Sequence, residues 1–572
     1  MRGTKLFWCL MFVTILCSYQ SNVSAQPTAS QTAGGVAQQE RMLEKSKSLE
    51  SRIGQEKSAA GQATSEDVGL PTDSGAKVLV QTINVEGATL IASSVIQSIV
   101  EQYQGKELSL RQIQKIASLI SDEYRKKGYL TSRAYVPPQK LEGGTLLIKV
   151  VEGKLGNVEV QGNRYFSTPL LKKSLNMQQG GYFDYSALQK SLVYINEHPD
   201  RTAKVVLVPG KVPGVTDVVM DVKDRMPIHA GFEYDNYGSR YINKSRYSTL
   251  LEHNNLTGHD DKLLVKFQTS EANYMRLYQG RYAIPLTPSF ELGAYALASK
   301  LELGKEFEDL ESRGKARIYG LFFNQAMVQE PTLDVRWNGG FDYKSVVNFL
   351  AEQKSSRDEL RIVKTGLDID AVDSWGRNIL SPEVDFGFAD ILGGMEAKDP
   401  MASRTGAGAV FQKGVVNYYR LQPMPLSTSL LWKNSGQFSN QTLAASEQFQ
   451  IGGPSSVRGY APAEQSGDKG YYTALEWSLP LYGLSKDIKV PGRQETFYDA
   501  TRLVTFWDWG YVNTKTPAAG DKEDNTLKGW GLGTRFNIKD ISARFELGYP
   551  IGKNISADGR RPHPWVEVIC KF

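Results

Sequence analysis

The chain has 572 residues, too many for one ordinary domain, and its formal charge is only +5 at pH 7. This near balance argues against the clustered basic face of a nucleic-acid-binding protein, so no nucleic acid is expected as a partner. The five histidines are scattered, and two of the three cysteines lie in the first 25 residues. The sequence therefore predicts no metal site, no cofactor and no enzyme.

Residues 1–25 are predicted to be a secretory signal peptide. Arg2 and Lys5 give a positive start, Leu6–Leu16 is the apolar segment, and Val-Ser-Ala at 23–25 fits a cleavage site. No later apolar run approaches the ~20 residues that a spanning helix needs. A membrane protein of this composition must therefore be a barrel, whose strands alternate apolar and polar residues.

Residues 26–77 are predicted to be a marginal helix, over Val36–Lys57, followed by a linker. Three apolar residues share one stripe of the helix: Met42, Leu49 and Ile53. Glu44 and Lys47 are spaced to pair along the same helix. The stripe is too thin to form a core by itself.

Residues 78–225 contain an internal repeat, with predicted units at 78–152 and 153–225. The segment 83–87 returns 75 residues later as 158–162. Ser109 and Asp184 are the matching helix caps, and Ser109 forms a capping box with Gln112. Each unit has one apolar helical face: Ile113, Ala117 and Ile120 in the first, Leu188, Leu192 and Ile195 in the second. The predicted order is strand, helix, helix, strand, strand.

A small sheet with helices on one face leaves an edge strand open. An extended client segment can add to such an edge through backbone hydrogen bonds. The residues predicted to mark this region are Ile83, Val85, Tyr135, Val158 and Val160. The alternative is that both repeats are spacers.

From Met226 to Phe572 the pattern changes to short alternating strands. We count 17 candidates, but bacterial single-chain barrels have an even number. The weakest, Ala444–Gln450, is expected to enter the following loop, which leaves 16 strands around an aqueous lumen. Asp368, Asp370 and Asp373 are interpreted as residues of a solvated rim.

The loop over Ile451–Tyr460 and the strand over Arg502–Asn513 carry the candidate site. Three glycines and a proline make the first a tight loop, with Val457, Arg458, Gly459 and Tyr460 at its tip. Alternation places Phe506, Asp508 and Gly510 on the inner wall. A guanidinium group on a loop in the lumen can donate two parallel hydrogen bonds to such an aspartate.

The segment V-R-G-Y after G-G-P resembles the inward-folded sixth loop of the Omp85 superfamily of outer-membrane barrels. The chain from Val78 to Phe572 resembles one branch of it, the TpsB transporters of two-partner secretion (ShlB/FhaC/HecB-like). The resemblance implies a 16-stranded transmembrane antiparallel β-barrel, preceded by a plug helix and two α+β POTRA domains. It also implies that Arg458 and Asp508 pair as a lock, and that Phe572 is an assembly signal.

The function implied by this resemblance is export of a large secreted TpsA-like exoprotein across the bacterial outer membrane, with POTRA domains in the periplasm. Outer-membrane lipid would surround the barrel, and barrel assembly machinery and periplasmic chaperones would act during biogenesis. A second hypothesis is an assembly factor that inserts barrel proteins, although such factors usually carry more POTRA copies. A diffusion porin is a third, but it leaves the repeat and the V-R-G-Y segment unexplained.

Overall fold

The computed structural model describes residues 32–55, 77–304, 308–309, 311–330, 332–483, 485–517, 522–552 and 555–572. The predicted signal peptide and most of the predicted linker lie outside these residues. The chain divides into two compact units, one formed by 58–227 and the other by 1–57 together with 228–572. Within the described residues, no helix combines the length and the hydropathy needed to cross a bilayer.

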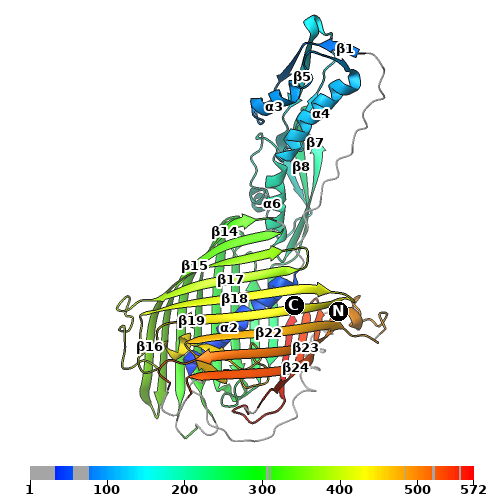
Figure 1. The fold of residues 1–572 in the computed structure, drawn as a ribbon. Helices are drawn as coiled ribbons and strands as arrows, with labels where there is room; N and C mark the ends of the chain where they lie inside the picture. The colour runs from blue at the N-terminus through cyan, green and yellow to red at the C-terminus, as the bar shows by residue number, and fades with distance from the viewer. Residues whose placement is uncertain are drawn as a thin grey trace. The chain divides into compact units, whose positions relative to one another are not determined.

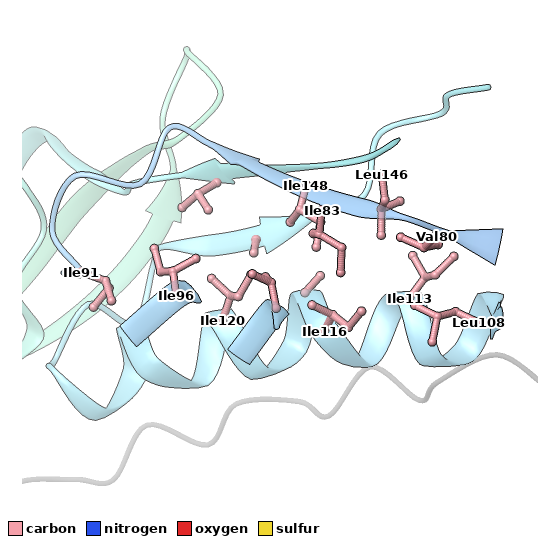
Figure 2. Packing of buried hydrophobic residues seen from close by; sticks show 14 of the residues in the cluster. Val80, Ile83, Ile91, Ile96, Leu108, Ile113, Ile116, Ile120, Leu146 and Ile148 are labelled. Carbon is pink, nitrogen blue, oxygen red and sulfur yellow. The ribbon is translucent and has the colours of Figure 1, made fainter. Parts of the chain in front are cut away.

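The first repeat consists of β1 (Lys77–Val80), β2 (Thr82–Glu86), α3 (Ser93–Val100), β3 (Lys106–Ser109), α4 (Leu110–Lys126), β4 (Arg133–Tyr135), η2 (Glu142–Gly144) and β5 (Thr145–Val151). Its sheet has the order β2-β5-β4, and β1 pairs with β3. Figure 2 shows the core, in which Ile113, Ile116 and Ile120 of α4 face Ile83 and Ile148 of the sheet.

The predicted capping box of α4 is confirmed. The Ser109 hydroxyl accepts a hydrogen bond from the Gln112 backbone, and the Gln112 side chain accepts one from the Ser109 backbone. Gly128 follows the helix with a φ of 90°, a left-handed conformation that favours glycine. Because both ends are fixed, the apolar face of α4 is held against the sheet.

The second repeat contains β6 (Lys154–Gln161), α5 (Thr168–Ser174), α6 (Tyr185–Asn196), β7 (Arg201–Pro209) and β8 (Val215–Asp224), with the sheet order β6-β8-β7. Asp184 caps α6, as the sequence predicts. Leu188 and Ile195 of α6 are buried against the sheet residues Val218 and Met220. Both repeats thus contain the predicted order of strand, helix, helix, strand, strand.

Sixteen antiparallel strands close into a barrel, which confirms the predicted number (Figure 1). They are β9 (Ile228–Asp235), β10 (Arg246–His253), β11 (Lys262–Ser270), β12 (Met275–Thr287), β13 (Phe290–Glu302), β14 (Arg313–Gln329), β15 (Leu333–Leu350), β16 (Gln353–Val372), β17 (Arg377–Gly387), β18 (Phe411–Met424), β19 (Thr428–Ser439), β22 (Lys469–Pro480), β23 (Thr501–Asn513), β24 (Asp524–Ile538), β25 (Ile541–Pro550) and β26 (His563–Lys571).

The barrel closes where β26 pairs with β9. Phe572 continues this pairing, since its backbone N–H donates to the Ala230 carbonyl oxygen at 2.8 Å. The short elements η3 (Glu271–Asn273) and α7 (Phe497–Ala500) lie in turns between strands. As expected, Ala444–Gln450 is not a wall strand, because it contains η5 (Ala445–Glu447) and the start of β20 (Phe449–Ile451), which pairs with β21 (Gln465–Gly467).

Helix α2 (Ala33–Gly54) lies inside the barrel, as Figure 1 shows. The Thr32 hydroxyl caps its start. Ala33 and Val36 pack against inward-facing residues of β12 to β15, and Leu49 and Ile53 pack against Ile379 and Tyr419. The thin apolar stripe therefore finds its partners on the barrel wall.

Candidate functional site

The loop between β19 and β22, residues 440–468, folds into the barrel interior. Gly452 and Gly453 have φ values of 104° and 95°, which reverse the chain after β20. The Gly453 N–H donates to the Tyr460 carbonyl oxygen at 3.0 Å, and the Tyr460 N–H donates to that of Val457 at 3.2 Å. This local bonding makes the V-R-G-Y tip a compact turn.

Arg458 at the tip is joined to Asp508 on β23 by three hydrogen bonds. Its Nε donates to Oδ2 at 2.9 Å and its Nη2 donates to Oδ1 at 2.6 Å. The Arg458 backbone N–H also donates to Oδ2, at 3.0 Å. The two side chains are 1% and 0% exposed, so the contact is a sheltered, two-pronged ion pair.

Arg458 contacts more than the predicted aspartate. Its Nη1 lies 2.9 Å from Glu476 and 3.4 Å from Glu546, and its guanidinium carbon lies 3.4 Å from the Phe506 ring centroid. The Trp565 indole N–H donates to the Arg458 carbonyl oxygen at 2.8 Å. The loop tip is therefore attached to four strands of the wall.

These contacts belong to a larger set, which we call the lumenal charge cluster. Continuous ion pairs join its eight members: Glu50, Lys433, Arg458, Glu476, Asp508, Arg535, Arg544 and Glu546. Four members are anionic and four are cationic, so the cluster is formally neutral. Such compensation is what buried charges require.

Glycines on the wall and at the loop tip let the tip approach the strands closely. A Cβ at Gly510 would lie 2.9 Å from Val457, and one at Gly459 would lie 2.7 Å from the Pro550 nitrogen. A Cβ at Gly548 would collide with the Arg458 carbonyl oxygen. Val457 and Tyr460 are buried in an apolar group with Tyr472, Val512 and Leu527 of the wall. The tip is thus held by shape as well as by charge.

Helix α2 is fixed to the wall by ion pairs along its length. Glu50 joins the lumenal charge cluster, contacting Arg544 at 2.7 Å and Lys433 at 3.1 Å. Lys47 contacts Glu233 on β9 and Glu567 on β26. Four more residues of α2 have carboxylate or cationic partners on the strands: Glu40, Arg41, Glu44 and Arg52.

Two sequence interpretations are wrong here. Glu44 and Lys47 do not pair with each other but with strand residues, because the lumen offers buried partners that an isolated helix lacks. Asp368 and Asp370 are not merely solvated rim residues, since both lie within 4.0 Å of the Arg52 guanidinium of α2. Asp373, in contrast, bonds Arg420 in an exposed turn.

The predicted client-binding residues fall into two groups. Ile83 is buried and Val85, Val158 and Val160 pack partly into the cores of the repeats. Tyr135, on the edge strand β4, has 41% of its surface exposed. Strand β2 pairs only with β5 among the strands that the structure describes. Strand β6 pairs with β8, and at its start it also bonds residues 180–182, through the Lys154–Tyr182 bridge and the Leu155 backbone. These edges therefore offer a client their backbone N–H and C=O groups more than their side chains.

Glu152, at the end of the first repeat, joins the segment between β2 and α3 to α4. Its carboxylate accepts hydrogen bonds from the Thr89 N–H at 2.5 Å, the Leu90 N–H at 2.7 Å and the Tyr124 hydroxyl at 2.7 Å. Burial opposes ionisation, but these bonds outweigh it and lower the pKa of Glu152 below its ordinary value. The first repeat thus holds an ionised carboxylate at its end.

Comparison with known proteins gives two family matches. A model described as "Haemolysin secretion/activation protein ShlB/FhaC/HecB" matches residues 214–536, and a ShlB-type POTRA model matches residues 78–153. The chain is 24% identical to the heme/hemopexin transporter protein HuxB of Haemophilus influenzae (strain 86-028NP), over 84% of this chain and 85% of the relative. It is 22% identical to the hemolysin transporter protein HpmB of Proteus mirabilis, over 98% and 99%.

Among solved structures, CdiB from Escherichia coli superposes with a TM-score of 0.74. The sequences are 20% identical, and the match covers 97% of this chain and 100% of that one. At this identity the match supports the fold, a barrel with amino-terminal POTRA domains.

Proposed function

Because the chain belongs to the ShlB/FhaC/HecB family of haemolysin secretion/activation proteins, we propose that it exports one large secreted partner protein through its barrel. The observation that carries this proposal is the double occupancy of the lumen by α2 and by the loop of residues 440–468. Both segments are held to the wall by noncovalent contacts, which include ion pairs and small apolar groups. A path for an extended polypeptide opens when they move, while the 16 wall strands remain paired.

We assign capture of the unfolded partner to the two POTRA domains, at 78–152 and 153–225. The open backbone edge of β2, and that of β6 beyond Leu155, suit β-strand addition, in which main-chain hydrogen bonds give affinity. Tyr135 adds an exposed aromatic contact at the opposite edge of the first sheet. This assignment favours an extended, unfolded client over a folded one.

No nucleotide is available in the periplasm to drive transport. Net movement is instead driven by folding of the partner outside the cell, with the barrel supplying a path. Outer-membrane lipid surrounds the barrel, and Phe572, which extends the β26–β9 seam, is the proposed signal for the barrel assembly machinery. Periplasmic chaperones would keep the chain soluble before insertion.

Photo-crosslinking in living cells tests the proposal. A photoreactive residue is placed at Thr82 or Asn84 on β2, with a matched probe on the exposed face of α4 at Lys115. Capture of one very large secreted protein from β2, but not from α4, is the expected result. Capture of many nascent barrel proteins would identify an insertase. No capture, together with an open pore in bilayers, would identify a porin.

A further inference from the structure

A row of basic side chains crosses the outer face of the barrel on β12, β13 and β14. Arg276 is the ladder partner of Lys300, and Lys300 is the ladder partner of Lys315. All three side chains are exposed. Like charges directly opposite each other destabilise a sheet, so such a row is unfavourable unless an anion compensates it.

The outward direction of the row follows from its neighbours. Met275, Leu277, Leu301 and Ala316 alternate with the basic residues and are buried with Ala33 of α2 inside the barrel. The basic residues therefore point away from the lumen. Arg317, two residues beyond Lys315 on β14, shares this outer face and is also exposed.

Among the residues that the structure describes, one carboxylate pairs with the row. Lys300 has one partner, Glu302, at 3.0 Å. Among the described residues, no carboxylate lies within 4.0 Å of Arg276, Lys315 or Arg317. The row thus keeps most of its positive charge.

The position along the strands places the row at the height of the lipid headgroups. Strand β9 follows the periplasmic POTRA domains, so the turns after β9, β11 and β13 are extracellular. The row lies within a few residues of these turns. Tyr278 and Tyr319, two and four residues further toward the periplasm than Arg276 and Lys315, are 54% and 52% exposed. Aromatic residues of this kind mark the membrane interface of a barrel.

We propose that the row Arg276–Lys300–Lys315 binds the phosphate groups of lipid A, the anchor of lipopolysaccharide in the outer leaflet. Neighbouring strands are about 5 Å apart, so one phosphate group can contact cations from two strands. The arginine fork matches two phosphate oxygens, and the two lysines add point charges. The acyl chains would then lie along the apolar face below, over Tyr278 and Tyr319.

The other side of the barrel provides a matched control. Lys469 on β22 and Lys528 on β24 also face outward near the extracellular ends, but β23 separates them. Lys469 lies over the Phe438 ring, 4.8 Å from its centroid. These two lysines carry the same charge as Arg276 and Lys315 without forming a row.

Native mass spectrometry of the full-length protein in detergent tests the proposal, with hexa-acylated bisphosphorylated lipid A as the probe. The double variant Arg276→Gln/Lys315→Gln should bind it roughly 30-fold more weakly than wild type, while Lys469→Gln/Lys528→Gln binds like wild type. Wild type should also lose binding to lipid A stripped of both phosphates, a measurement that needs no variant. Equal binding by all three proteins, or equal losses in both variants, would overturn the site. Equal affinity for phosphatidylglycerol, or competition by millimolar inorganic phosphate, would overturn the assignment to lipid A.

Discussion

Replacing Arg458 by Ala should release the tip of the loop of residues 440–468 while the barrel remains intact. Both Arg458 and Asp508 are almost fully buried, so the relevant magnitude is that of a broken buried ion pair, about 3–5 kcal/mol. The value for an exposed pair, about 1 kcal/mol or less, does not apply here. Since about 1.4 kcal/mol is a factor of ten, the equilibrium constant for the locked state should fall by a factor of roughly 140 to 4,000.

The control for this change is Arg535→Ala. Arg535 belongs to the same lumenal charge cluster, contacting Glu476 at 2.6 Å and Glu546 at 3.0 Å, but it lies on β24 and not on the loop. Both variants remove one positive charge from the lumen. Only Arg458→Ala should free the loop tip, because Arg458 is the one member of the lumenal charge cluster that lies on the loop.

The assay has two readouts at equal protein level in the outer membrane. Partner secretion should fall strongly for Arg458→Ala, and the loop should become accessible to protease added to intact cells. Heat-modifiable migration on gels should stay unchanged, because no wall hydrogen bond is removed. Wild-type secretion and an inaccessible loop in Arg458→Ala would refute the lock.

Three further outcomes follow from particular contacts. Gly459→Val should weaken seating of the loop by about 1–3 kcal/mol, since even a Cβ would crowd the Pro550 nitrogen, and protease access to the loop reports it. Lys47→Ala should raise single-channel conductance in bilayers more than Lys45→Ala does. Lys47 has two buried carboxylate partners, whereas Lys45 is exposed and has one partner at 3.8 Å. Equal conductances of the two variants would contradict this prediction. Because the pKa of Glu152 is lowered on folding, its contribution is present above the pKa of the unfolded chain and is lost as pH falls through the folded pKa. Glu152→Gln should therefore lower the unfolding temperature of the POTRA unit at pH 7 and no longer do so at acidic pH, as followed by differential scanning calorimetry.

Much of the fold can be predicted from the sequence because the signals are local. The capping box at Ser109 and the apolar faces of the repeat helices depend on spacings of three and four residues. The strands of the barrel follow from two-residue alternation, as at Phe506, Asp508 and Gly510 on β23. These patterns determine which way each side chain points within its own element.

The partners of inward-facing charges could not be predicted in the same way. Alternation places Arg544 and Glu546 on the inner face of β25, but it does not show that Glu546 meets Arg458 and Arg544 meets Glu50. Those contacts depend on the register and tilt of strands far apart in sequence. Glu476 is a further partner of Arg458 that the sequence reasoning missed, although its inward position follows from the alternation of β22.

The lumenal charge cluster couples the helix to the loop. With both segments in place, four cations and four carboxylates balance. Departure of α2 removes Glu50 and leaves one excess positive charge, which departure of Arg458 would remove. Departure of the loop first leaves one excess negative charge, which departure of Glu50 would remove. Each exit therefore lowers the electrostatic cost of the other, and this coupling must be reciprocal.

A double-mutant cycle with Glu50→Gln and Arg458→Gln measures this coupling. Each single change leaves one uncompensated charge among the buried members of the cluster, whereas the double change restores neutrality with three cations and three carboxylates. Protease access to the loop should therefore increase less in the double variant than the two single effects predict. A parallel cycle with Glu40→Gln, whose partner Arg246 lies outside the cluster, should be additive. Additivity in the Glu50 cycle as well would mean that the helix and the loop leave the lumen independently.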